Sequence, residues 1–133
     1  MSAAYFIVLD KEDPGFDTSV NGKSLAQDAK RIAKIAKALG IRELDEFVSY
    51  SPEEARAMIE DMGGDPNDVD FPEVNWFSAK DGLAWVAKLT EHVKSNRTAV
   101  KNADGVLSDL EEYAEVLEKA KEAGVRWRLQ IDF

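Results

Sequence analysis

The chain has 133 residues, of which 44% are hydrophobic and 32% are charged, and its formal net charge is −9. This balance is typical of one globular domain, which we expect to span residues 1–133, and the surplus of carboxylates opposes binding to the phosphates of nucleic acid. Cysteine is absent, which excludes disulfides, thiolate catalysis and cysteine-ligated zinc; with no secretion signal and no apolar run of about 18 residues, we expect a cytoplasmic protein without membrane spans.

Both ends of the chain are predicted to be β-strands. Residues 5–9 form a continuous apolar run closed by Asp10, which is typical of a central strand buried on both faces. Residues 125–133 instead alternate between apolar and polar side chains, which is the period of a strand with one solvated face. Because a lone strand leaves its backbone groups unpaired, we expect the two ends to pair in one small sheet.

Periodicity and capping residues predict four helices between the strands. The first begins with a capping-box pattern, Ser24 followed by Gln27, and ends at Gly40. The third is opened by Ser78, and its inner stripe should consist of Leu83, Val86, Leu89, Thr90 and Val93. Residues 46–49 are predicted to form a brief edge strand. The predicted helices cover residues 24–39, 52–62, 79–93 and 106–123.

The predicted fold is therefore α+β, with about four helices packed on a two- or three-stranded sheet that pairs the N- and C-terminal strands. Trp85 and Trp127 fall on inner faces and are assigned to the core. Arg126 and Arg128 share the polar face of the last strand, where they could hold an anion if that face is open. We favour pairing with the acids of the preceding helix, which are Glu111, Glu112, Glu115, Glu118 and Glu122.

The negative charge is concentrated between residues 41 and 75. Eleven carboxylates oppose Arg42 and Arg56 in this segment, a local sum of −9 that equals the net charge of the chain. Such a surface attracts cations and basic partners. The spacing departs from the calcium-binding EF-hand, because Val69 and Trp76 stand at ligand positions, so a solvated loop is favoured over a metal site. The loop's oxygen-bearing side chains are Asp65, Asn67, Asp68, Asp70 and Glu73.

Two adjacent aromatic residues, Trp76 and Phe77, follow the acidic loop. In an extended chain neighbouring side chains point to opposite sides, so both cannot face inward. One interpretation is a hydrophobic staple onto the helix that follows. The other is an aromatic anchor beside an acidic rim, which would suit a basic protein partner.

A second candidate site follows the first predicted strand, where Asp10, Asp13 and Asp17 could ligate a divalent ion together with the acidic loop. This alternative requires the two loops to meet. No glycine-rich phosphate-binding motif occurs in the sequence. His92 is the only histidine, which excludes a zinc site with several histidine ligands within one chain. No G-x-S-x-G motif indicates a serine that His92 could activate in a catalytic triad.

The sequence therefore favours a non-catalytic function. We expect a protein-binding or regulatory module of the immunity or inhibitor kind that needs no cofactor. Its partner would be a basic protein that meets the acidic surface through Asp65, Asp68, Asp70, Glu73, Trp76 and Phe77. Two alternatives stay open, namely a metal-dependent small-ligand binder or enzyme that uses loop carboxylates, and a structural homo-oligomer.

Overall fold

The computed structural model describes residues 4–11, 15–16, 20, 22–49, 52–65 and 74–132. The fold is α+β, as predicted. Within the described residues, two strands are joined by five α-helices and two 3-10 turns. In chain order these are β1 (Ala4–Leu9), α1 (Lys23–Gln27), α2 (Ala29–Leu39), a 3-10 turn (Leu44–Phe47), α3 (Pro52–Asp61), α4 (Ala79–Ser95), a second 3-10 turn (Arg97–Ala99), α5 (Ala103–Ala123) and β2 (Trp127–Asp132).

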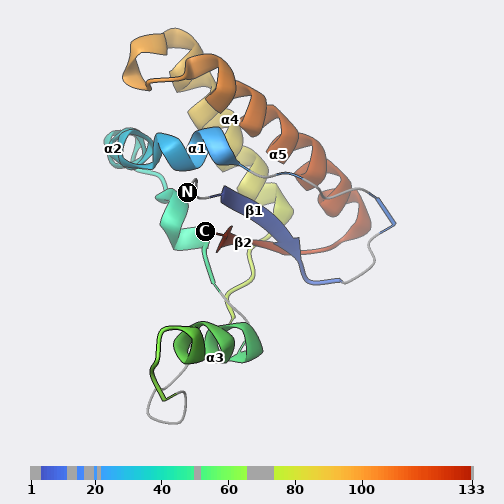
Figure 1. Ribbon diagram of the computed structural model, residues 1–133. Helices are drawn as coiled ribbons and strands as arrows, with labels where there is room; N and C mark the ends of the chain where they lie inside the picture. The colour runs from blue at the N-terminus through green and yellow to red at the C-terminus, as the bar shows by residue number, and fades with distance from the viewer. Residues whose placement is uncertain are drawn as a thin grey trace.

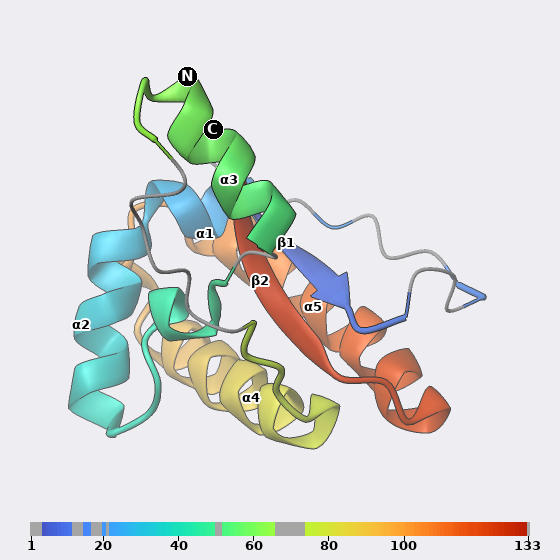
Figure 2. The same ribbon diagram turned by 90° about the horizontal axis from the view of Figure 1, so that it is seen from below.

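The sheet lies between two unequal layers. Figure 1 shows α4 and α5 running side by side along one face of the sheet, with α1 and α2 beside them, while α3 stands on the other side. Seen from below in Figure 2, α3 lies in front of the strands and α4 and α5 lie behind them. All the helices except α3 therefore form one layer.

The two terminal strands pair with each other, which confirms the central topological prediction. They are antiparallel, in a register that places Ala4 opposite Asp132 and Leu9 opposite Trp127. The far edge of β2 is also hydrogen-bonded: Phe77 and Trp127 exchange backbone bonds of 2.8 and 2.9 Å, and the Ser49 N–H donates to the Leu129 carbonyl at 3.0 Å. The prediction that residues 5–9 form the central strand is therefore wrong. β2 takes the inner position, and β1 pairs only with β2 among the described residues.

An aromatic cluster around Trp127 forms the centre of the core. The indole is completely buried, stacks on Phe47 at 4.7 Å between ring centroids and lies 6.4 Å from Trp85. Its Nε1 donates to the Ser78 carbonyl at 3.0 Å. At Gly82 of α4 an added Cβ would come within 2.6 Å of the Trp127 ring, so only glycine permits this close approach. The prediction that Trp85 and Trp127 belong to the core is confirmed.

Two buried carboxylates shape the region where one long helix was predicted. Instead of a single helix over residues 24–39, α1 and α2 are separate and meet at Asp28. The Asp28 carboxylate accepts the N–H groups of Lys101 and Asn102, both at 3.1 Å. Asp109 of α5 accepts the Ser24 N–H at 2.9 Å, so a distant carboxylate replaces the predicted capping box. Side chain to backbone bonds of this kind satisfy the open amides of helix ends.

Two further local predictions are wrong. Residues 44–47 form a 3-10 turn rather than part of an edge strand, and only Val48 makes a single bridge to Leu129. Arg126 and Arg128 do not pair with the acids of α5. Arg126 binds Asp10, with Nε 2.8 Å from a carboxylate oxygen, and the buried Arg128 donates to the Ser49 carbonyl and to Gln130. Neighbouring segments therefore cover Arg128, whereas Arg126 stays exposed.

A buried tyrosine links α5 to β1. The Tyr113 hydroxyl donates to the Tyr5 carbonyl, and burial, aided by the charge of Asp109, raises the pKa of Tyr113 well above its ordinary value. Since only the unfolded chain ionises near pH 10, stability should fall as pH rises past about 10. We expect Tyr113→Phe to lower the free energy of unfolding by about 1 kcal/mol at neutral pH. The variant should also lose less stability than the wild type between neutral pH and a pH above about 10, as measured by urea unfolding at each pH. Equal losses in the variant and the wild type above pH 10 would contradict this assignment.

Candidate functional site

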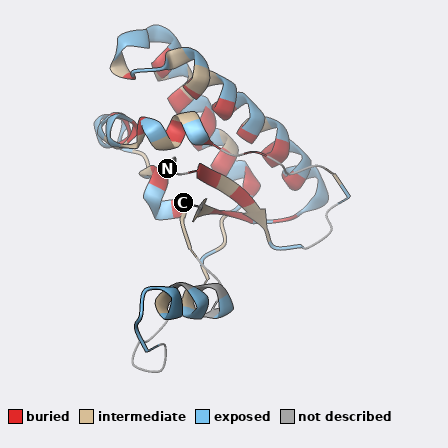
Figure 3. Cartoon of the chain, in the orientation of Figure 1, coloured by how far each residue is buried: buried red, intermediate tan, exposed pale blue. Residues whose placement is uncertain are grey.

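Helix α3 and the turn that follows it, residues 52–65, project from the rest of the domain, and we call them the α3 arm. None of the described side chains of the arm is buried. Figure 3 shows buried residues along α4 and α5 but none on α3. The helix ends where the Gly64 N–H donates to the Ile59 carbonyl at 2.9 Å, with Gly63 in the left-handed conformation at φ 83°. This termination is local, so it needs no contact with the core.

The arm is amphipathic, and its described side chains are exposed or half-buried. Ala55, Ile59 and Met62 are spaced to share one face, and Met62 is 81% exposed. Five carboxylates oppose Arg56 between residues 52 and 65. The arm therefore presents an apolar stripe within an acidic surface.

The predicted partner-binding acids fall only partly within the described chain. Asp65 is exposed at the end of the α3 arm. Asp68, Asp70 and Glu73 lie outside the described residues. Of these four carboxylates, the structure therefore describes only Asp65, and their role in partner binding stays a prediction.

Trp76 and Phe77 lie between the arm and α4, and both are half-buried. The Arg128 guanidinium lies 5.3 Å from the centre of the Trp76 ring, a cation–π arrangement on the outer side of the sheet. The Phe77 ring packs edge-on to Phe47 at 4.8 Å and carries Arg42 at 5.2 Å. Phe77 thus serves mainly the aromatic cluster, whereas Trp76 is half-buried and contacts Arg128.

The alternative carboxylate site is represented in the structure by Asp10. Its two oxygens accept the Arg126 Nε and the Arg126 backbone N–H, at 2.8 and 2.9 Å. Asp13 and Asp17 lie outside the described residues. Within the described part of the chain, no three carboxylate or histidine side chains gather as a metal site would require. The end of β1 and the turn after α3 also lie on different sides of the molecule (Figures 1 and 2).

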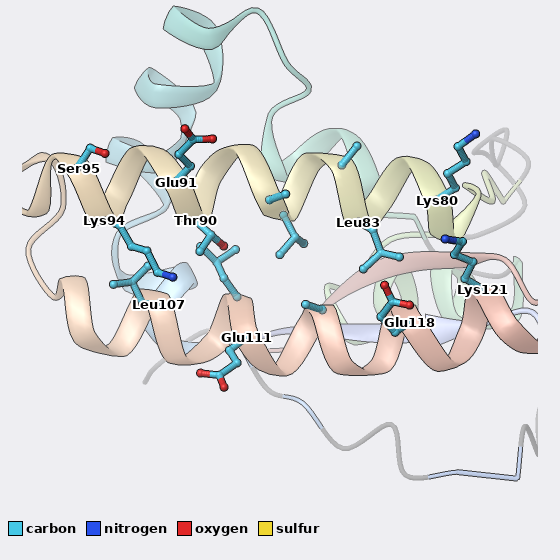
Figure 4. Close-up of a pocket in the computed structure, with 15 residues that line it drawn as sticks. Lys80, Leu83, Thr90, Glu91, Lys94, Ser95, Leu107, Glu111, Glu118 and Lys121 are labelled. Atoms are coloured by element: carbon cyan, nitrogen blue, oxygen red, sulfur yellow. The ribbon is translucent and has the colours of Figure 1, made fainter.

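A groove of about 1050 Å³ runs between α4 and α5 on the side away from the sheet. Figure 4 shows its residues along the two helices. Small and apolar side chains form the floor, among them Leu83, Ala84, Ala87, Thr90, Leu107 and Ala114. Leu83 and Thr90 were predicted for the inner stripe of this helix, but both are only half-buried and line the groove. Leu83 also packs against the core.

Lysines stand at both ends of the groove. Lys94 reaches from α4 toward α5 at one end, and Lys121 reaches from α5 toward α4 at the other, with Glu118 beside it (Figure 4). Glu91 and Glu111 point away from the groove in the same view. Sequence reasoning missed this surface, although alanines beside an apolar helix stripe are the pattern that leaves a furrow between two helices.

Comparisons with known proteins add no assignment. No family model, curated protein or solved structure matches this chain. Among the described residues, none of the helices has the length and apolar character needed to cross a bilayer. The α3 arm, the groove and the charges on both are therefore the features that bear on function.

Proposed function

We propose that this protein is a non-catalytic binding module whose α3 arm docks on a basic protein partner. The observation that carries the proposal is that α3 buries none of its described side chains: among its carboxylates, Met62 is 81% exposed, and Ala55 and Ile59 are only half-buried. An exposed apolar patch with a charged rim is characteristic of interaction surfaces.

The energetics of short helices support this function. Helices below about 12–15 residues are marginal in water without tertiary packing, and α3 has 10 residues. A partner with an apolar groove would bury the stripe of Ala55, Ile59 and Met62, which is the helix-in-groove mode of recognition. Basic residues around that groove would pair with Glu60, Asp61 and their neighbours and speed association.

The proposed partner surface extends beyond the arm. Trp76, which is half-buried and follows the acidic loop in the sequence, would contribute an aromatic contact, and Asp65, Asp68, Asp70 and Glu73 would supply further acids. Such a module would act as a regulator of the immunity or inhibitor kind, in the cytoplasm, where a cysteine-free chain is at no disadvantage. It would require no cofactor and no nucleic acid.

Charge reversal on the arm tests the proposal. The triple variant Glu60→Lys, Asp61→Lys and Asp65→Lys should keep α3 intact, because cations favour the C-terminal end of a helix. A matched control makes the same change on exposed acids of α5, with Glu112→Lys, Glu115→Lys and Glu122→Lys. Immobilised wild type and both variants would be exposed to cell lysate, and the retained proteins would be compared by mass spectrometry.

We expect basic proteins that the wild type and the α5 variant retain but the arm variant loses. Their retention should weaken as salt is raised, because contacts between exposed charges are screened. The same retained set on all three proteins would overturn the proposal. So would equal losses from both variants, because net charge alone would then explain the binding.

A further inference from the structure

Two surfaces of the molecule match in length and in charge. One is the α3 arm, a short amphipathic helix that buries none of its described side chains. The other is the α4–α5 groove, an apolar furrow between two antiparallel helices that no described element covers. We propose that the α3 arm of one molecule occupies the α4–α5 groove of a second copy. This inference rests on the proposed role of α3 as a docking helix. The groove of a second copy would compete with the basic partner for the arm.

The dimensions of the two surfaces match. At about 1.5 Å per residue, the 10 residues of α3 span about 15 Å. The groove extends along α4 from Lys80 to Ser95, about 22 Å on the same measure, so it can hold the whole helix. A third helix laid into the furrow of an antiparallel pair gives ordinary helix-bundle packing.

Chemistry matches as well as length. The stripe of Ala55, Ile59 and Met62 would lie against a lining that includes Ala87 and Ala114, whose small side chains permit close approach. The arm carries acids at both ends of its helix, Glu53 at one and the pair Glu60 and Asp61 at the other. The groove has lysines at both ends, Lys94 at one and the pair Lys80 and Lys121 at the other.

The arrangement of the domain makes this contact intermolecular. The sheet separates α3 from the α4–α5 pair, and the groove lies on the far side of that pair (Figure 1). Arm and groove are therefore different patches, so the contact is heterologous and joins molecules head to tail. One short helix buries little surface, so we expect weak association that a tighter basic partner can displace.

Complementation between two variants tests this geometry. Ile59→Glu places a charge in the apolar stripe of the arm, and Ala87→Glu fills and charges the floor of the groove. Neither side chain is buried, so both variants should fold. Ala57→Glu on the other side of α3 and Ala38→Glu on α2 are matched controls at exposed alanines. Sedimentation velocity from low micromolar to near-millimolar protein would measure association, and circular dichroism would confirm folding.

We expect the wild type and both controls to sediment faster as concentration rises, whereas each test variant stays monomeric. Mixing the two test variants should restore association but stop at a 1:1 dimer, because only one intact arm and one intact groove remain. A monomeric wild type at the highest concentration, unchanged association of either variant, or a mixture that stays monomeric while the wild type associates would each overturn the inference. Loss of basic partners from the arm variants without any self-association would overturn it and leave the proposed function standing.

Discussion

Replacing Trp127 with alanine should remove a large part of the stability of the fold. Large-to-small changes of a fully buried tryptophan cost about 3–5 kcal/mol, out of about 5–15 kcal/mol for a typical domain. Here the indole also holds the Ser78 carbonyl at the start of α4 and stacks on Phe47. Urea unfolding followed by far-ultraviolet circular dichroism would measure the change, since that signal does not depend on tryptophan emission.

Trp76→Ala is the matched control for that experiment. Trp76 is half-buried and has its cation–π contact with Arg128 on the outer side of the sheet. Its removal should cost about 1 kcal/mol, because exposed and half-exposed contacts of this kind are weak. Similar losses from the two variants would mean that the core is not organised around Trp127.

Asp28→Ala should also lower the free energy of unfolding strongly, although less than Trp127→Ala. The carboxylate is 2% exposed and accepts the Lys101 and Asn102 N–H groups before α5, besides pairing with Arg31 at 3.2 Å. Two backbone donors would lose a charged, buried acceptor, for a cost of about 3 kcal/mol. Thermal and urea unfolding at neutral pH would record it as a lower midpoint with a similar slope.

The exposed ion pair between Arg97 and Asp104 provides the comparison for Asp28. Asp104 is 87% exposed, and Asp104→Ala should change the free energy of unfolding by only about 0.5 kcal/mol. If Asp28→Ala proves as mild as Asp104→Ala, the carboxylate does not hold the start of α5, and the break between α1 and α2 requires another cause.

Local patterns were sufficient to predict the elements whose signals lie within a few residues. The alternation of the last strand predicted β2, and Ser78 with Asp81 marked the start of α4, where the Ser78 hydroxyl accepts the Asp81 N–H at 3.1 Å. Predictions failed where a distant residue decides the local structure. The break at Asp28 depends on amides more than 70 positions away, and Arg128 is buried by Ser49 and Trp76.

The candidate surfaces show the same limit. The acidic character of the α3 arm and its apolar spacing were visible in the sequence, but its separation from the core was not, because any amphipathic helix is first assumed to pack inward. The α4–α5 groove was missed because Leu83 and Thr90 fit a core stripe as well as a groove floor. Exposure alone distinguishes the two.

The double pairing of β2 has a consequence for synthesis of the protein. Of the described elements, β1 leaves the ribosome first and β2 last, yet β1, Val48 and Phe77 all take their sheet partners from β2. The helices can form while the chain is still growing, but β1 must wait with its apolar side chains uncovered. Nascent chains halted before Trp127 should therefore bind chaperones and be degraded readily, and protection should arise abruptly once the final strand has left the exit tunnel.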